Sequence, residues 1–107
     1  MTTLLQRTVL FADLRGSTGL FETLGNAEAA TVVTQSVALM GRVVATCGGV
    51  VVKTLGDGLM AVFEEPQQGI DAADEMQESL ERIVARRHLS GQRPQLQRHV
   101  RAFRGQW

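Results

Sequence analysis

Two aspartates lie in settings where α/β proteins collect functional groups. Asp13 ends the apolar run Thr8-Val-Leu-Phe-Ala-Asp13, and Asp57 lies between two glycines in Gly56-Asp-Gly58. Two carboxylates that adjacent strands bring together repel each other unless cations lie between them. Such hard oxygen ligands suit Mg²⁺ or Mn²⁺, which prefer one or two carboxylates together with substrate oxygens. Asp13 and Asp57 are therefore candidate metal ligands, although either residue alone is also typical of an ordinary turn.

The segment after Asp13 adds a candidate phosphate site. Leu14-Arg-Gly-Ser-Thr18 is a turn of small and hydroxyl residues with the capacity to cap a helix. If a helix follows, the backbone N–H groups at its start are available to a bound anion. The segment is thus suited to hold a polyphosphate beside the two carboxylates.

The elements that must position these residues follow from the hydrophobic pattern. The run Thr8–Asp13 favours a buried strand because it is short, apolar and rich in β-forming residues. A short helical piece is expected to end at Gly25, and Asn26 is a good N-cap for a longer helix that ends at Gly48-Gly49. The longer helix has apolar residues at three- and four-residue steps, which predict one buried face: Ala29, Val32, Val33, Val37, Met40, Val43 and Val44.

A hairpin and a third helix complete the pattern. Val50–Leu55 and Leu59–Phe63 are β-rich runs on either side of Gly56-Asp-Gly58, a pattern typical of a β-hairpin. Glu64-Glu-Pro66 ends the second run, and a helix is expected from Gln68 to Arg86. The residues of this helix that are expected in register with the core are Ile70, Ala73, Met76, Gln77, Leu80, Ile83 and Val84.

The order strand, helix, helix, strand, strand, helix predicts an α/β layered arrangement, and 107 residues suit one domain. No uninterrupted apolar run approaches ~18 residues, so no membrane span is expected. The charge changes near Arg82: residues 1–81 hold all 11 acidic side chains and four basic ones, whereas residues 82–107 hold seven arginines and no acid. We therefore interpret residues 1–86 as the domain and residues 87–107 as an irregular, Arg-rich tail.

The Arg-rich tail bears on nucleic-acid binding, and the single cysteine bears on the cellular compartment. Arginines attract nucleic acid, but the only aromatic residues among them are Phe103 and Trp107, so we expect no specific nucleic-acid binding. Cys47 is the single cysteine and has no internal disulfide partner. A reducing, cytoplasmic environment is therefore the default expectation.

Together, the two aspartate segments resemble the catalytic domain of class III adenylate and guanylate cyclases. In that family an F-x-D-[IL]-x-G-[FS]-T segment ends the first strand, and a K-x-x-G-D segment forms the hairpin turn. Here they stand as Phe11-Ala-Asp-Leu-Arg-Gly-Ser-Thr18 and Lys53-Thr-Leu-Gly-Asp57. The resemblance covers roughly residues 7–84. It implies an α+β, ferredoxin-like fold, of which the chain would hold the β-α-α-β-β-α portion.

The resemblance implies a role for each matching residue. Asp13 and Asp57 would hold two Mg²⁺ or Mn²⁺ ions, and the backbone carbonyl of Leu14 would join one of them. Lys53 falls on the base-selecting position. An ammonium group only donates hydrogen bonds, so it suits N1 of adenine and not N1–H of guanine, and ATP is favoured over GTP. The residues that would line the triphosphate are Gly16, Ser17 and Thr18.

The implied reaction converts ATP to 3′,5′-cyclic AMP and pyrophosphate in a homodimer with a signalling role. In the family, an Asn and an Arg from later strands stabilise the transition state across the dimer interface, and this sequence reaches Trp107 before them. We therefore expect the C-terminal part of the domain to be missing and the 107-residue polypeptide alone to lack cyclase activity. The alternative is a non-catalytic cyclase-like module that binds metal–nucleotide or dimerises.

Overall fold

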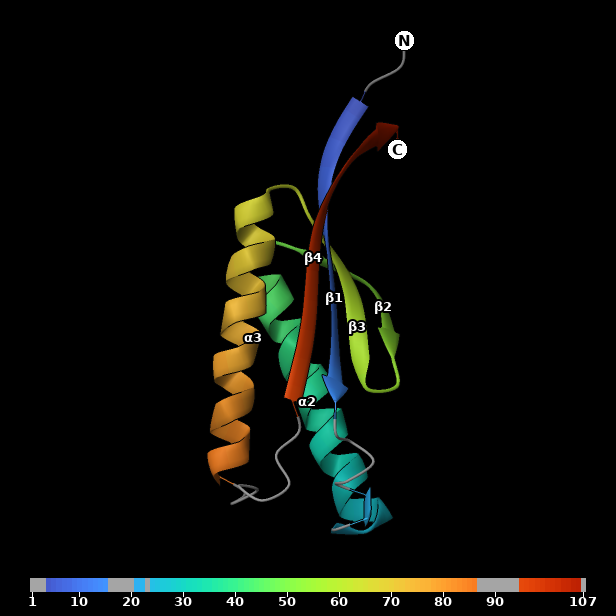
Figure 1. Cartoon of the computed structure of the whole chain (residues 1–107), viewed down its shortest axis with the longest axis vertical. Helices are drawn as coiled ribbons and strands as arrows, with labels where there is room; N and C mark the ends of the chain where they lie inside the picture. Colours follow the sequence, from blue (N-terminus) through green and yellow to red (C-terminus); the bar gives the residue numbers. More distant parts are fainter. Residues whose placement is uncertain (1–3, 16–20, 23, 87–94, 107) are drawn as a thin grey trace.

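The computed structural model describes residues 4–15, 21–22, 24–86 and 95–106. The strands form one antiparallel sheet in the order β2-β3-β1-β4. Both long helices lie on one side of this sheet, and no other described element covers its opposite side (Figure 1). The expected α+β architecture is confirmed. Along the chain the elements are β1 (Leu4–Arg15), α2 (Asn26–Thr46), β2 (Val50–Leu55), β3 (Gly58–Phe63), α3 (Pro66–Arg86) and β4 (Gln95–Gln106).

The core lies between the sheet and the two helices. Alternate residues of the two central strands point toward the helices because side chains in a strand alternate between its faces. These residues are almost completely buried: Leu10, Ala12, Leu14, Leu59, Ala61 and Phe63. The helices contribute the predicted apolar positions, among them Met40, Val43, Val44, Ala73, Met76 and Leu80.

Helix α2 agrees with the sequence-based prediction except at its start. Asn26 is the first helical residue rather than the cap, since Gly25 occupies the N-cap with φ 83° and no side chain caps the helix. Glycine adopts this left-handed backbone without a steric penalty, so the turn at Gly25 decides where the helix begins. At the other end, Gly48 has φ 82° directly after Cys47, which confirms the expected stop.

Helix α2 qualifies the expectation that no segment could span a membrane. It is long and apolar enough to meet the length and composition of a membrane span. Its buried residues, however, include Val32, Ser36, Met40 and Val44. Most of the buried face packs against the sheet and α3, as in the core helix of a globular domain.

Helix α3 begins at Pro66, earlier than expected, because the fixed φ of proline suits the first helical position. The expectation that Ile70 is buried is wrong, since its side chain is 45% exposed. Gly69 faces the sheet instead: a Cβ built on it would lie 2.9 Å from Cγ2 of Thr8. The helix therefore approaches β1 through a glycine, and this contact turns Ile70 outward.

The C-terminal segment contains a strand, so the expectation of an irregular end is wrong for residues 95–106. Strand β4 pairs with β1 along its whole length, from Gln95 opposite Arg15 to Gln106 opposite Leu4. The connection from α3 to β4, residues 87–94, lies outside the described residues. The described elements therefore include a C-terminal strand that the predicted order lacks.

Arg98 explains why the strand pattern was hard to find in the sequence. It occupies a position on the helix side of the sheet, between Leu96 and Val100, where an apolar residue is expected. Its Nη1 donates a hydrogen bond of 2.9 Å to the Ala73 carbonyl oxygen and lies 3.5 Å from a carboxylate oxygen of Asp74. The charged end thus reaches the polar surface of α3 while the aliphatic part crosses the sheet edge.

Candidate active site

The end of β1 and the turn between β2 and β3 lie side by side (Figure 1). Asp13 is opposite Gly58 in the antiparallel ladder, and the Leu14 N–H donates a hydrogen bond of 2.9 Å to the backbone carbonyl oxygen of Asp57. Asp13 and Asp57 are both half-buried. The backbone thus brings the two predicted aspartates to one end of the sheet, on adjacent segments.

Gly58 makes this close approach possible. A Cβ built on Gly58 would lie 2.2 Å from the Ala12 carbonyl oxygen and 2.8 Å from Cα of Asp13. Any other residue would therefore push the turn away from β1. A Cβ on Gly56, in contrast, would meet nothing within 4 Å. The sequence identified both glycines as turn residues and gave no sign that only one of them sets the distance to Asp13.

Asp13 and Lys53 share the open face of the sheet, the face without a described helix. The buried, even-numbered residues of β1 point to the helices, so Phe11 and Asp13 point the other way. Lys53 is exposed and lies opposite Met60, which lies opposite Phe11. Lys53 is therefore in the row next to that of Asp13. The strands that carry them are two spacings apart, or about 10 Å.

A bulge in β2 gives Lys53 this orientation. Val51 lies opposite Ala61 and packs against the core, and Lys53 lies opposite Met60, with the irregularity between them. In a regular strand, residues two apart share a face, so Lys53 would point to the helices with Val51. The extra residue at Val52 changes this alternation and places Lys53 on the open face.

The two carboxylates suit a divalent cation. Neither Asp13 nor Asp57 has an ion-pair or side-chain hydrogen-bond partner among the residues that the structure describes. Half-buried carboxylates on adjacent segments, without a basic partner, are suited to a bound cation. In the same part of the chain, no third acidic, histidine or cysteine residue completes a cluster with them. This donor set fits Mg²⁺ or Mn²⁺ with substrate oxygens better than it fits a structural zinc site.

The remaining predicted contacts fall on the segment after β1. Leu14 is 2% exposed and its side chain lies in the core, so only its backbone is available to a ligand. Gly16, Ser17 and Thr18 lie outside the described residues. Of the short helix expected after them, residues 21, 22 and 24 are described and have helical backbone.

Strand β4 adds side chains beside the site that sequence analysis did not assign. Gln97, His99 and Arg101 are exposed and alternate on the open face. Gln97 lies opposite Asp13, and its side-chain oxygen accepts a hydrogen bond from Nε of Arg15. Polar residues at every second position were the available signal for a half-covered strand.

The chain is similar to known cyclases in sequence. It matches the family model of the adenylate and guanylate cyclase catalytic domain over residues 2–92. It is also 31% identical, over 84 residues, to an adenylate cyclase from Anabaena cylindrica; the aligned part is 77% of this chain and 17% of that protein.

Solved structures give the same result for the fold. A guanylyl cyclase superimposes with a TM-score of 0.77 and 22% identity, covering 96% of this chain and 56% of that chain. The adenylyl cyclase CyaB from P. aeruginosa superimposes with a TM-score of 0.73 and 21% identity, covering 99% of this chain and 59% of that chain. The chain thus spans little more than half of these structures. Because the family model covers most of its residues, the chain belongs to the family of adenylate and guanylate cyclase catalytic domains.

Proposed function

We propose that this chain provides the ATP site of an adenylate cyclase, which converts ATP to 3′,5′-cyclic AMP and pyrophosphate. The observation that carries the proposal is the placement of Asp13 and Asp57 at one end of the sheet, linked through the backbone hydrogen bond between Leu14 and Asp57. The chain also belongs to a family whose reaction needs such a pair of carboxylates.

Asp13 and Asp57, with the backbone carbonyl of Leu14, are the residues that we assign to two Mg²⁺ or Mn²⁺ ions. When bound, such ions activate the ribose 3′-hydroxyl and neutralise charge on the phosphates. The contribution of the chain is to fix the ligands in space. Asp13 belongs to a strand that is paired on both sides, and Asp57 belongs to a turn that is hydrogen-bonded to that strand. Rigid positioning of this kind accounts for much of the catalysis of an intramolecular displacement.

Lys53 is the residue that we assign to recognition of adenine. Its ammonium group is on the same face as Asp13 but two strands away. A nucleotide with its base near Lys53 would thus extend its phosphates toward Asp13. From the family motif we assign the contacts to the triphosphate to Gly16, Ser17 and Thr18. Because Lys53 donates and does not accept hydrogen bonds, it discriminates against the N1–H of guanine.

The proposal includes a homodimer and a cytoplasmic location. Exposed apolar residues lie on the open face and along β2, among them Phe11 and Val50, which are 43% and 68% exposed. An uncovered apolar surface beside an unpaired strand edge favours association with a second copy. The cytoplasmic location rests on Cys47, which is the single cysteine and is free in the structure.

Metal-dependent ATP binding tests the site in the chain as it stands. Thermal denaturation would be followed with ATP and Mn²⁺, with ATP and EDTA, and without ligand. At an ATP concentration of 100 times Kd, we expect about 2.7 kcal/mol of stabilisation that requires Mn²⁺. Asp57→Asn should abolish this gain, because one carboxylate cannot replace two as ligands of the ions. Equal stabilisation of the wild type and Asp57→Asn would contradict the proposed site.

Two further measurements complete this test. Glu78→Gln on the exposed surface of α3 removes the same charge as Asp57→Asn away from the site, so it should retain the ATP response. The reaction is then followed as formation of 3′,5′-cyclic AMP from ATP. The 107-residue chain alone should give no product, and a form that contains the complete catalytic domain should give product that depends on Asp57. Metal-dependent ATP binding with no cyclic product from that complete form would instead support a non-catalytic module that only binds metal–nucleotide.

A further inference from the structure

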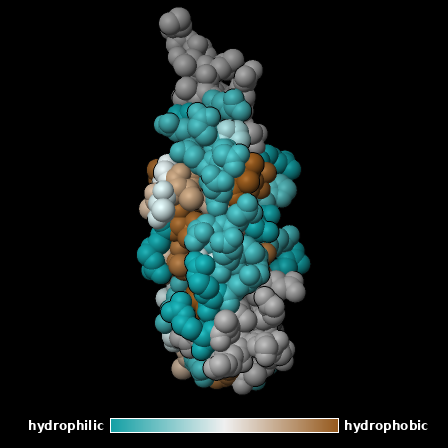
Figure 2. Space-filling model, turned by 90° about the vertical axis from the view of Figure 1, so that its left-hand side faces the viewer, coloured by the Kyte–Doolittle hydropathy of each residue, from teal (hydrophilic) through white to brown (hydrophobic). Residues whose placement is uncertain are grey.

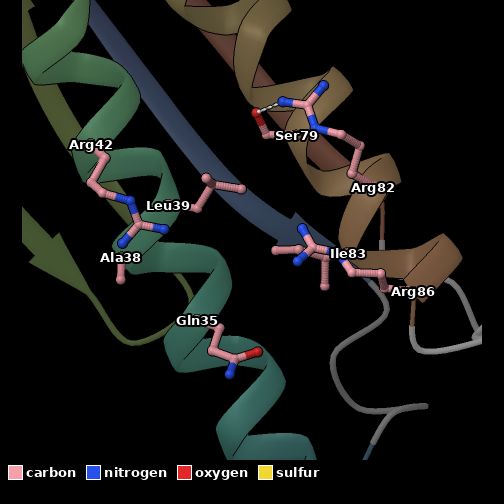
Figure 3. Close-up of a pocket in the computed structure, with 8 residues that line it drawn as sticks. All are labelled: Gln35, Ala38, Leu39, Arg42, Ser79, Arg82, Ile83 and Arg86. Atoms are coloured by element: carbon pink, nitrogen blue, oxygen red, sulfur yellow. Dashed lines mark hydrogen bonds between the residues drawn. The ribbon is translucent and has the colours of Figure 1, made fainter.

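A cavity of about 510 Å³ opens between α2 and α3 (Figure 3). These helices cover the face of the sheet opposite Asp13. Its walls come from both helices. Ala38, Leu39 and Ile83 supply apolar surface, and Arg42 and Arg86 supply charge from opposite walls. Its volume is within the range of small-molecule sites, about 300–1,000 Å³.

Three arginines line the cavity. Arg42 is the sole basic residue of α2, and it lines the same cavity as Arg82 and Arg86 of α3. In Figure 3 the Arg86 side chain extends from α3 toward α2. Like charges on the walls of one cavity repel, and an anion placed between them relieves the repulsion.

Arg82 is held in place from the α3 side. Its Nη2 donates a hydrogen bond of 2.8 Å to Oγ of Ser79 and lies 3.2 Å from a carboxylate oxygen of Glu75. Ser79 is 3% exposed and bonds to Glu75 as well, at 3.2 Å. A buried hydroxyl and one carboxylate therefore orient this guanidinium group and neutralise one of the three positive charges.

Arg42 and Arg86 have no such partner. Neither guanidinium group forms an ion pair or a hydrogen bond with any residue in the described part of the chain. The outer surface of α3 is mostly hydrophilic (Figure 2). Three acidic side chains of that helix contact residues outside the cavity lining: Asp71 bonds to Gln67, Asp74 to Arg98 and Glu81 to Gln77, whereas Glu75 pairs with Arg82. Because Glu75 neutralises Arg82, two of the three positive charges that line the cavity, those of Arg42 and Arg86, remain available to a ligand.

We propose that this cavity binds an organic phosphate: a small molecule with a phosphate dianion between Arg42, Arg82 and Arg86, and an apolar body against Leu39 and Ile83. The planar guanidinium group binds two phosphate oxygens at once, and such charge-assisted hydrogen bonds are about twice as strong as neutral ones. A dianion matches the two remaining positive charges, whereas a monocarboxylate leaves one of them without a partner. The apolar walls account for the organic part of the ligand.

This site is separate from the proposed nucleotide site and does not depend on it. The helices that form it cover the face of the sheet opposite Asp13 and Lys53. It also requires no metal, because guanidinium groups supply the positive charge. Binding to it can therefore be measured with divalent cations removed, a condition in which the carboxylate site cannot take up a phosphate through a metal.

Calorimetric titration of the full 107-residue chain in EDTA at pH 7.5 tests the proposal with three probes. The probes are 1-naphthyl phosphate, 1-naphthoate with the same apolar body, and inorganic phosphate with the same charged group. At this pH the phosphate ester is a dianion, since its second pKa is about 6. We expect naphthyl phosphate to bind at least ~10-fold more tightly than either other probe. Equal affinity for naphthoate, or no binding of naphthyl phosphate, would overturn the assignment.

Arginine variants locate the binding. Arg42→Gln and Arg86→Gln should each raise the Kd for naphthyl phosphate by ~10-fold or more, because each removes a charge-assisted hydrogen bond. The matched control is Arg7→Gln on β1, which removes the same charge outside the cavity. Its Kd should stay within about twofold of the wild type, as expected for a distant charge screened by salt. An equal loss of affinity in all three variants would show general charge attraction and refute a specific site.

Discussion

Thr8 carries an unsatisfied hydroxyl in the core. The residue is completely buried on the helix side of β1, and its Oγ1 has no hydrogen-bond partner among the residues that the structure describes. A buried polar group without a partner lowers the free energy of unfolding, and replacing it with an apolar group of the same shape removes that penalty. We expect Thr8→Val to raise the free energy of unfolding by about 1 kcal/mol.

Urea denaturation measures this effect as a higher midpoint at an unchanged slope. The control is Thr54→Val on the exposed strand β2, where the hydroxyl is not buried and the change should be smaller. A lower midpoint for Thr8→Val would mean that the hydroxyl has a partner, such as an ordered water molecule, in solution.

Cys47 offers a second prediction at the residue scale. Burial raises the pKa of its thiol, and the negative charges of Asp71 and Glu75 raise it further. The thiolate is the reactive form, so alkylation of folded Cys47 by iodoacetamide should be slower at pH 8 than alkylation of the same thiol in urea. The rate should rise with pH through a range above that of a free cysteine. In the Asp71→Asn variant the rate at pH 8 should increase; equal rates in folded and unfolded protein would contradict the prediction.

At the scale of elements, the contact between β1 and the β2–β3 turn depends on Gly58. Gly58→Ala would place a methyl group within 2.2 Å of the Ala12 carbonyl oxygen, so the turn must move. Such overpacking typically costs about 1–3 kcal/mol of stability. We also expect faster hydrogen exchange of the Leu14 amide, which bonds to Asp57 across this contact.

Gly56→Ala is the matched control, because a Cβ at Gly56 meets nothing within 4 Å. It should leave the Leu14 amide protected and change stability much less than Gly58→Ala. If both variants behave alike, the effect belongs to the loss of turn flexibility and not to the distance between the turn and β1.

Local patterns predicted most of these elements. The three-and-four spacing of α2 and the Gly-Asp-Gly turn depend on neighbours in the chain, and the structure confirms both. The failures come from contacts between distant segments. Arg98 interrupts the apolar pattern of β4 in the sequence. Its partners, the carbonyl oxygen of Ala73 and the carboxylate of Asp74, lie on α3. The face of the sheet on which Lys53 lies likewise depends on a bulge that the sequence of β2 does not reveal.

The candidate site was partly predictable for the same reason. Asp13 and Asp57 each stand at the end of a strand or in a turn, and the antiparallel pairing of β1 with β3 brings these positions together. Gln97 could not be placed beside Asp13 without β4, whose pairing joins residues far apart in the chain. Local composition therefore indicates which residues are functional candidates, and long-range pairing decides which of them become neighbours.

On the scale of the whole molecule, the two faces of the sheet differ in cover. Helices α2 and α3 cover one face (Figure 1). The other face and the edge strand β2 expose apolar side chains, among them Phe11, Val50 and Val52. Val50 is the most exposed of them, at 68%, and its partner Val62 carries the apolar surface toward the centre of the sheet. If a second copy of the chain covers this surface, a charged residue placed on the surface should weaken the association of the two copies.

Val50→Asp should therefore weaken self-association of the chain. Analytical ultracentrifugation over a concentration series should show a dimer for the wild type and at least a ~10-fold higher dimer Kd for Val50→Asp, because a buried valine is lost and a charge must be desolvated. Ile70→Asp is the matched control: Ile70 is also an exposed aliphatic residue, 45% exposed, but it lies on α3. Its dimer Kd should remain that of the wild type. A wild type that stays monomeric at every concentration, or equal weakening by both variants, would rule out the open face as the surface of association.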